Sequence, residues 1–158
     1  MHRYRGSPNW YHRHDPIWAK FARLRGPCAP ARQGCALIDC CGRYIASALA
    51  APDAVSLMRS RYTAFTLRNE AYLLATWYPS VRPDSLAFPE NQKWLGLDVR
   101  AHSVDPNNPN RATVEFVARS RIDGRGIRLH ELSSFVREAG RWYYLAGIGR
   151  PPKPAKRR

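Results

Sequence analysis

The chain has 158 residues, of which 44% are hydrophobic, and it carries a formal net charge of +14. This length predicts one domain with short appendages. No apolar run approaches the roughly 18 residues of a membrane-spanning helix, and the basic N-terminus lacks the apolar region of a secretory signal. We therefore expect a cytoplasmic protein that makes no contact with a membrane.

The positive charge lies mainly at the two ends of the chain. Residues 1–25 hold six Lys and Arg and one acid, and residues 150–158 hold five and no acid. The segment between them carries only about +4. Basic tails bind polyanions without sequence preference and lose affinity as salt rises. These ends predict weak, non-specific contact with nucleic acid or ribosomes, and two solvated, flexible segments are the alternative that we favour.

Residues 1–27 form a basic N-terminal arm that also contains the aromatic residues Trp10, Tyr11, Trp18 and Phe21. Rings that stack on bases and cations that bind phosphates are typical of an RNA-binding arm. The mixture matches no recognised motif, so we interpret the arm as flexible. The tail at residues 150–158 is basic and rich in Pro, and we expect it to be disordered.

The segment 28–45 contains all four cysteines of the chain: Cys28, Cys35, Cys40 and Cys41. In a cytoplasmic protein such clustering favours a metal site over disulfides, and four thiolates suit a tetrahedral zinc ion. The cysteines are separated by six, four and no residues, which differs from a pair of CxxC knuckles. Partly buried free thiols are the alternative.

Two consecutive helices are predicted between Ala51 and Trp77. Pro52 suits a first helical turn, and Asn69 is placed to cap the second helix after a break at Arg68. Each helix has an apolar face at helical spacing, formed by Val55, Met58, Tyr62 and Phe65 in the first and by Leu73, Leu74 and Trp77 in the second. We expect Pro79 to end the second helix, and one further helical turn around Asp84–Ala87.

From Trp94 onward the apolar period becomes two, which predicts four antiparallel strands joined as a meander. The turns are DPNNPN, Asp123-Gly124 with Gly126, and Ala139-Gly140. The residues expected to share one face are Leu95, Leu97, Val99 and Ala101, then Val114, Phe116 and Ala118, then Ile127, Leu129, Glu131, Ser133 and Phe135. Trp77, Trp94 and Trp142 are expected in the core. A helix pair followed by such a sheet makes the fold class α+β.

Several blocks of the sequence resemble a known family. In chain order they read CCGRYI, LMRSRYTAF, YLLATWYPSVRP, KWLGLDV, ATVEFVAR, RLHELSSFVRE and GRWYYLAG. From about Cys40 to Gly147 they resemble the YchJ-like proteins, which are SEC-C-motif proteins of uncharacterised function. The resemblance implies that residues 46–149 form the cone-shaped fold of nuclear transport factor two. In that fold N-terminal helices pack on a curved antiparallel sheet of about four strands and leave a pocket inside, and the sheet often forms a homodimer.

The resemblance also bears on the cysteines. In the family the segment usually reads C-P-C-G-S-G, five further residues, then C-C, and its four cysteines are thought to hold zinc. Aligned on Cys40 and Cys41, this chain has Ala29 and Ala31 at the first two ligand positions, so the motif is degenerate. Cys28 and Cys35 are the substitute ligands. Motifs of this type dock partner proteins elsewhere, which implies an unidentified protein partner here.

Three further departures from the family follow. Tyr78 replaces a common His, and Ser134 replaces a common basic residue. The resemblance also begins abruptly near Cys40, which leads to the hypothesis that the reading frame of residues 1–37 is shifted. The arm would then have no evolved function.

Enzymes with this cone fold work from inside the pocket with Asp, His, Tyr or Glu as acid or base. The candidates here are Tyr62, Glu115, His130 and Glu131. Neighbouring residues on a strand point to opposite faces, so His130 and Glu131 do so. Glu131 shares its face with apolar residues, and a carboxylate in an apolar lining is a candidate acid or base. The alternatives are an ion pair of Glu131 with Arg59 or Arg61, and a surface or satisfied core position for His130.

We favour a small non-enzymatic binding protein that has a cone-shaped domain behind a degenerate zinc-motif docking segment. The alternative is a hydrolase or isomerase that uses Glu131 or His130 in the pocket. A closed pocket with a buried carboxylate favours the enzyme, and a filled cone with exposed apolar patches favours the binding protein.

Overall fold

The computed structural model describes residues 40–47 and 49–149. Helices α2 to α4 and a short 3₁₀ helix, η2, come first and four strands follow, so the predicted α+β class is confirmed. The bounds are α2 Gly42–Ala46, α3 Ala54–Thr66, α4 Glu70–Ala75, η2 Pro79–Val81, β1 Gln92–Asp105, β2 Asn108–Ile122, β3 Arg125–Glu138 and β4 Arg141–Gly147. The arm at 1–27, residues 28–39 and the tail at 150–158 lie outside the described residues.

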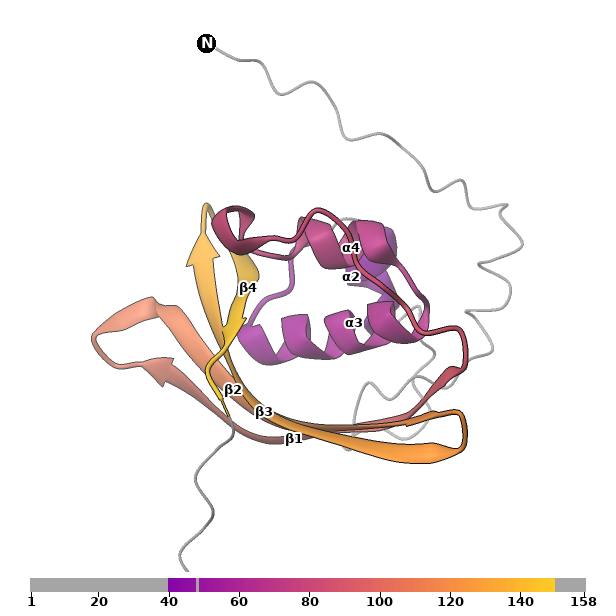
Figure 1. Ribbon diagram of the computed structural model, residues 1–158. Coiled ribbons are helices and arrows are strands. Elements are labelled where there is room, and N and C mark those ends of the chain that lie inside the picture. The colour runs from indigo at the N-terminus through magenta and orange to yellow at the C-terminus, as the bar shows by residue number, and fades with distance from the viewer. Residues whose placement is uncertain (1–39, 48, 150–158) are drawn as a thin grey trace, which may run out of the picture.

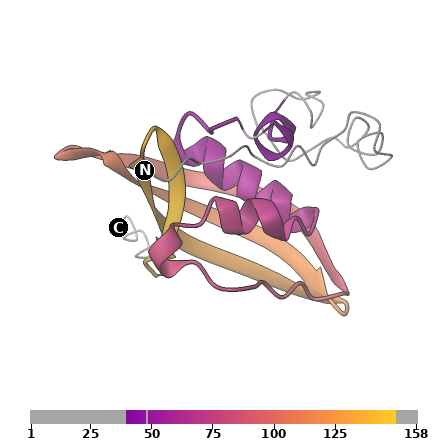
Figure 2. The same cartoon turned by 90° about the horizontal axis from the view of Figure 1, so that it is seen from above.

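The sheet curves around helix α3, as the predicted cone requires. Figure 1 shows the strands bending past α3, with α2 and α4 on the side of that helix away from the sheet. Seen from above, all helices lie over the same face of the sheet (Figure 2). We call this the inner face and the opposite one the outer face. None of the helices in the described ranges is long and apolar enough to span a membrane.

Side-chain caps divide the helical segment where the sequence predicts. The carboxylate of Asp53 accepts a hydrogen bond from the Ser56 N–H at 2.7 Å and starts α3. Arg68 has a positive φ of 54°, which turns the chain, and the Asn69 side chain then accepts from the Tyr72 N–H at 3.0 Å to start α4. The predicted break is therefore confirmed.

Two predictions for the segment after α4 are wrong. The helix ends at Ala75 rather than at Pro79, because Thr76 and Tyr78 leave it to pair with β4. The Tyr144 N–H donates to the Thr76 carbonyl at 2.9 Å, and the Tyr78 N–H donates to the Tyr144 carbonyl at 2.8 Å. The predicted turn around Asp84–Ala87 is absent from this described segment, and η2 supplies the turn earlier. In this segment the Leu86 N–H donates to the Glu70 side chain at 2.7 Å.

The four strands form one antiparallel sheet in the order β1-β2-β3-β4, as predicted. Two of the hairpin turns have positive φ at both central residues, 48° and 81° at Asp123-Gly124, and 48° and 75° at Ala139-Gly140. This geometry matches the right-handed twist of the flanking strands. The turn at Asp123-Gly124 sets the pairing of β2 with β3, in which Phe116 lies opposite Glu131.

The predicted face of β1 is confirmed at Leu97 and Val99 and is wrong at Leu95 and Ala101. The register of β1 against β2 shifts between Trp94 and Gly96 and again between Val99 and Ala101. Each shift changes which residues point inward. Leu97 and Val99 face the core opposite Ala118 and Phe116, whereas Leu95 is exposed and Ala101 lies opposite the outer-face residue Glu115.

The core lies between α3 and the inner face. Its most buried side chains come from both layers: Leu57, Val114 and Phe135. Leu73 of α4 is buried in a second cluster, among the helices. Trp142 is buried as predicted, and Trp77 and Trp94 are half-buried. On β3 the predicted face is confirmed by the pairing, but Ile127 and Leu129 at its end remain 43% and 44% exposed.

Candidate functional site

Glu131 lies on the inner face of β3, directly opposite the buried Phe116. One carboxylate oxygen accepts a short hydrogen bond from the Ser133 hydroxyl at 2.6 Å, and the Tyr144 hydroxyl lies 3.4 Å from the same oxygen. Ser133 is fully buried and shares the inner face, since residues two apart on a strand point the same way. Glu131 is therefore held from β3 and β4 together.

Arg61 is a cation buried on α3, with only 3% of its surface exposed. Its guanidinium donates to the Leu73 carbonyl at 2.8 Å and to the Thr76 hydroxyl at 2.7 Å, at the C-terminal end of α4. That end of a helix carries partial negative charge, which suits a cation. Burial lowers the pKa of Arg61 to about 10, against the attraction of nearby Tyr144 and Tyr72.

Tyr144 lies between the Arg61 cation and the Glu131 carboxylate. The guanidinium carbon of Arg61 is 4.7 Å from the centre of the Tyr144 ring and 4.9 Å from that of Trp77. Burial raises the pKa of Tyr144, the negative charge of Glu131 raises it further, and Arg61 opposes the shift. Within the described residues no ion pair joins Glu131 to Arg59 or Arg61, so the expected ion pair is not found.

Protein packs against the half-buried Glu131 from two sides. A Cβ atom added at Gly147 would lie 2.8 Å from Glu131 Cδ, so only glycine fits there without a shift. On the other side the rings of Phe135 and Trp77 meet Tyr144 edge to face, at centroid distances of 5.7 and 5.0 Å. Phe135 is buried, whereas Trp77, Glu131 and Tyr144 are half-buried, so this cluster lies at the margin of the core.

His130 and Glu115 are brought together by the fold, on the outer face of the sheet. Their side chains are joined by a 2.7 Å hydrogen bond, which is an ion pair when the imidazole is protonated, and each is about a quarter exposed. Because Glu131 is on the inner face, His130 and Glu131 point to opposite faces, as the strand period predicts. His130 and Glu131 therefore do not share one site.

Tyr62 lies apart from Glu131, at the opposite edge of the sheet. It is buried on α3, and its ring meets Trp94 of β1 edge to face at 5.3 Å. Burial raises the pKa of Tyr62, and a backbone hydrogen bond with Gly96 partly offsets this. Of the four candidates, the fold thus pairs only Glu115 with His130.

The double cysteine is anchored to the helical layer. Cys41 is buried and packs in a cluster with Ile45, Ala64 and Leu73, and Cys40 lies against this cluster. No three potential metal-ligating side chains come together in the described part of the chain. Cys41 is disulfide-bonded, and two cysteines are too few for a structural zinc site. A zinc ion would need ligands from Cys28 and Cys35, which lie outside the described residues.

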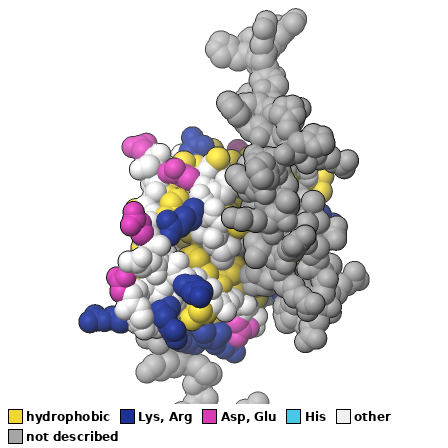
Figure 3. Space-filling model, turned by 90° about the vertical axis from the view of Figure 1, so that its right-hand side faces the viewer, with side chains coloured by type: hydrophobic (Ala, Val, Ile, Leu, Met, Phe, Trp, Pro, Cys, Tyr) yellow, Lys and Arg dark blue, Asp and Glu magenta, His cyan; other side chains and the backbone are white. Residues whose placement is uncertain are grey.

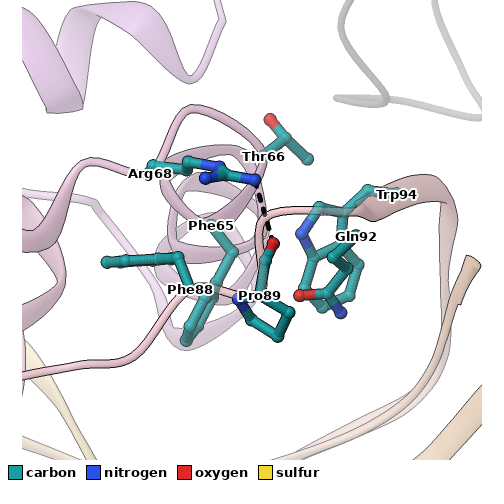
Figure 4. A pocket seen from close by; sticks show the side chains of 7 residues that line it. All are labelled: Phe65, Thr66, Arg68, Phe88, Pro89, Gln92 and Trp94. Carbon is teal, nitrogen blue, oxygen red and sulfur yellow. Dashed lines mark hydrogen bonds between the residues drawn. The ribbon is translucent and has the colours of Figure 1, made fainter. Parts of the chain in front are cut away.

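A shallow hollow lies where α3 ends and β1 begins. Figure 4 shows Phe65, Phe88 and Trp94 around it, with Arg68 at its rim. Arg68 donates to the carbonyl oxygens of Pro89 and Glu90, at 2.9 and 2.6 Å, and so fixes the loop that forms one wall. This hollow combines aromatic rings with an exposed cation.

Sequence reasoning missed the roles of Arg61, Ser133 and Tyr144. The spacing of Leu57, Arg61 and Ala64 places Arg61 on the buried side of α3, which is a usable signal. Ser133 is two residues from Glu131 and shares its face. Nothing local indicates Tyr144, because its contact with Glu131 depends on the pairing of β3 with β4.

The comparisons with known proteins agree with this fold. The family described as the YchJ middle NTF2-like domain matches residues 53–147. A UPF0225 protein of Methylibium petroleiphilum is 52% identical over 85% of this chain and 95% of its own length. Another, from Chromobacterium violaceum, is 47% identical over 82% of this chain and 96% of its own. Residues 40–158 make up only about three quarters of the chain, so the match to the Methylibium protein must also include residues before Cys40. This speaks against a change of reading frame as late as Leu37.

Two solved structures are similar to this one. The solution structure of a SEC-C motif containing protein from Rhodopseudomonas palustris has a TM-score of 0.66 and 33% identity, and the match covers 75% of this chain and 95% of that one. The crystal structure of a SEC-C motif containing protein from Psychrobacter arcticus has a TM-score of 0.66 and 29% identity, over 87% and 89% of the two chains.

Proposed function

Because the chain belongs to the YchJ-like family and its domain has the NTF2-like fold, we propose that it is a non-enzymatic binding protein that acts through its surface. The observation that carries the proposal is that the protein itself already engages the inner-face carboxylate of Glu131. One of its oxygens accepts from the hydroxyls of Ser133 and Tyr144, and Gly147 packs against the carboxylate group. An acid or base must reach the reacting atom of a substrate, and the protein holds one oxygen of this carboxylate instead.

Exposed apolar side chains support the same proposal. Ile127 and Leu129 lie beside each other on the inner face, where β3 runs on beyond the end of β4. Exposed apolar patches are typical of interaction sites. Partners under this proposal are an unidentified protein docked on the segment 28–45 in the cytoplasm, and a second copy of the chain against the sheet.

The enzymatic alternative has one observation in its favour. A carboxylate, a hydroxyl and a phenol, from Glu131, Ser133 and Tyr144, meet beside the buried cation Arg61. Such clusters occur in active sites and also in structural networks. The geometry favours the structural role, since the hydroxyls of Ser133 and Tyr144 both meet one oxygen of Glu131 within the protein.

Fragment binding followed by NMR tests the proposal. The full chain, labelled with ¹⁵N, is titrated with a library of small polar compounds. We expect the amide signals of Glu131, Ser133 and Tyr144 to stay unchanged, because these side chains already bond to one another. Compounds that shift these three signals together, and lose the effect in Glu131→Gln, would support the enzyme and overturn the binding protein.

Zinc belongs to this proposal as a cofactor of the docking segment. Its ligands would be Cys28, Cys35, Cys40 and Cys41, held as thiolates in a tetrahedron. Metal analysis of protein purified without added zinc checks this. About one zinc per chain supports a folded docking segment, and no zinc leaves the cone domain alone as the binding unit.

A further inference from the structure

The outer face carries four exposed cations at one end, where β2 turns into β3. In the sheet register Lys93 lies directly opposite Arg121, and Arg119 lies directly opposite Arg128. Directly opposite residues point to the same face, 4.5–5.5 Å apart in typical sheets. Dark blue side chains gather at the lower end of the molecule in Figure 3, the level of this hairpin in Figure 1. We call these four residues the hairpin cations.

The acids of the same face do not neutralise them. Asp98 forms an ion pair with Arg100 at 2.9 Å, and the Glu115 carboxylate hydrogen-bonds with His130 at 2.7 Å. Within the described residues, none of the hairpin cations makes an ion pair or a side-chain hydrogen bond. Like charges placed opposite each other destabilise a sheet. Folding therefore gains nothing from this arrangement, and an anionic ligand would relieve it.

The aromatic hollow lies at the same end of the sheet, around the edge strand β1. Gln92 and Trp94 line the hollow, and Lys93 between them points to the outer face. Arg68 is exposed at the rim of the hollow. The cation Lys93 and the aromatic ring of Trp94 therefore belong to neighbouring residues that face opposite sides of the edge strand.

We propose that this end of the domain binds single-stranded nucleic acid. The hairpin cations contact the phosphates, and the strand passes around the β1 edge so that a base meets the rings of the hollow beside Arg68. Proteins that bind single strands without sequence preference combine such a basic track with aromatic rings. A duplex keeps its bases stacked and cannot present one to the hollow. The proposal rests on the proposed binding function and names its partner.

Fluorescence anisotropy with a labelled uridine 12-mer tests the proposal on the full chain between 50 and 200 mM KCl. Arg119→Gln/Arg128→Gln removes two hairpin cations. The matched control is Arg82→Gln/Arg111→Gln, which removes two other exposed charges and leaves the basic ends intact. Arg111 is on the same strand and face as Arg119, about 26 Å away at 3.3 Å per residue.

We expect the hairpin variant to bind about tenfold more weakly at 100 mM KCl, because two phosphate contacts are lost. Its plot of log affinity against log salt should be shallower by about 1.4, at 0.7 per phosphate contact of a single strand. The control pair should change affinity less than twofold. Phe88→Ala should weaken binding about fivefold with an unchanged salt slope, since it removes a ring and no charge.

Equal losses in the two charge variants would overturn the proposal, because net charge or the basic ends would then explain binding. A 12-base-pair duplex that binds as tightly as the single strand would overturn it too. Displacement by polyglutamate as efficient as by unlabelled oligonucleotide would assign the surface to an acidic protein instead. The outcomes for this inference and for the proposed function can be told apart. If none of the variants changes oligonucleotide affinity, and the fragment library leaves the NMR signals of Glu131, Ser133 and Tyr144 unchanged, this inference fails and the proposed binding function stands.

Discussion

The guanidinium of Arg61 lies 4.7 Å from the centre of the Tyr144 ring, so a helix and the last strand meet through a buried cation. The same guanidinium donates two hydrogen bonds to the C-terminal end of α4. One side chain on α3 thus joins α4 and β4, which lie far apart in the sequence. We infer that Arg61 stabilises the closed end of the cone.

Replacing Arg61 should destabilise the domain strongly. Arg61→Met keeps the apolar contacts but leaves the Leu73 carbonyl without its donor, and we expect a loss of about 2–3 kcal/mol in the free energy of unfolding. Arg61→Lys keeps the charge without the planar fork and should lose roughly half as much. Urea unfolding followed by circular dichroism measures both. The exposed Arg82→Met is the control, expected to change stability by less than about 0.5 kcal/mol, and an equally small effect at Arg61 would contradict the inferred role.

Gly147 should be intolerant of a side chain because of Glu131. Gly147→Ala places a Cβ 2.8 Å from Glu131 Cδ, and should push the carboxylate off Ser133. We expect a cost of about 1–2 kcal/mol, with Gly126→Ala, which has open space around it, as the control. Glu131→Ala should relieve most of this cost in the double mutant. If the shifts in unfolding midpoint of the two single mutants simply add in the double mutant, the close contact is not the cause.

Alkaline pH should destabilise the domain through its buried tyrosines. Burial raises the pKa of Tyr62, Tyr72 and Tyr144 above the usual value of 10.0. Their contribution to stability is complete below pH 10 and is lost as the pH rises further, because the unfolded chain releases these protons first. The contribution of Arg61 to stability changes in the opposite direction, rising with pH between its folded pKa of about 10 and its usual value of 12.5. This single arginine is set against three tyrosines.

Unfolding free energies measured from pH 8 to 11 check this direction. Tyr72→Phe removes one of the groups, while Ser60 keeps its bond to the Leu57 carbonyl. The decline above pH 10 should be less steep in that variant. A stability that is flat or rises through this range would contradict the tyrosine explanation.

The turn at Ala139-Gly140 offers a stabilising change. Ala139 has a φ of 48°, a conformation that costs alanine about 1 kcal/mol and suits asparagine better. Ala139→Asn should therefore raise the free energy of unfolding by about 0.5 kcal/mol. Ala87→Asn, in an exposed loop without a positive φ, is the comparison. Equal effects of the two changes would mean that the turn geometry is not responsible.

Turn residues allowed most of the sheet to be predicted from the sequence. Asp123-Gly124 has the composition of a two-residue hairpin turn, and it fixes the register that places Arg119 opposite Arg128. The pairing of the hairpin cations Arg119 and Arg128 could therefore, in principle, be predicted from the sequence. The face of β1 was predicted correctly only at Leu97 and Val99, because the register shifts after Trp94 and Val99 interrupt the alternation on which the prediction was based.

The candidate site depended more on tertiary contacts. The alternation of β3 predicted that Glu131 and His130 face opposite ways, which the pairing bears out. It did not predict that His130 meets Glu115, fifteen residues away, or that Tyr144 separates Glu131 from Arg61. To predict those contacts, one must know how β2, β3, β4 and α3 are placed relative to one another.

Chemical-shift mapping of the ¹⁵N-labelled full chain with the uridine 12-mer tests most directly whether this protein works through its surface. We predict that the signals of Lys93, Arg119, Arg121 and Arg128 shift with the oligonucleotide, while those of Glu131, Ser133 and Tyr144 do not. Shifts centred on the inner-face residues, with the hairpin cations unchanged, would contradict this account.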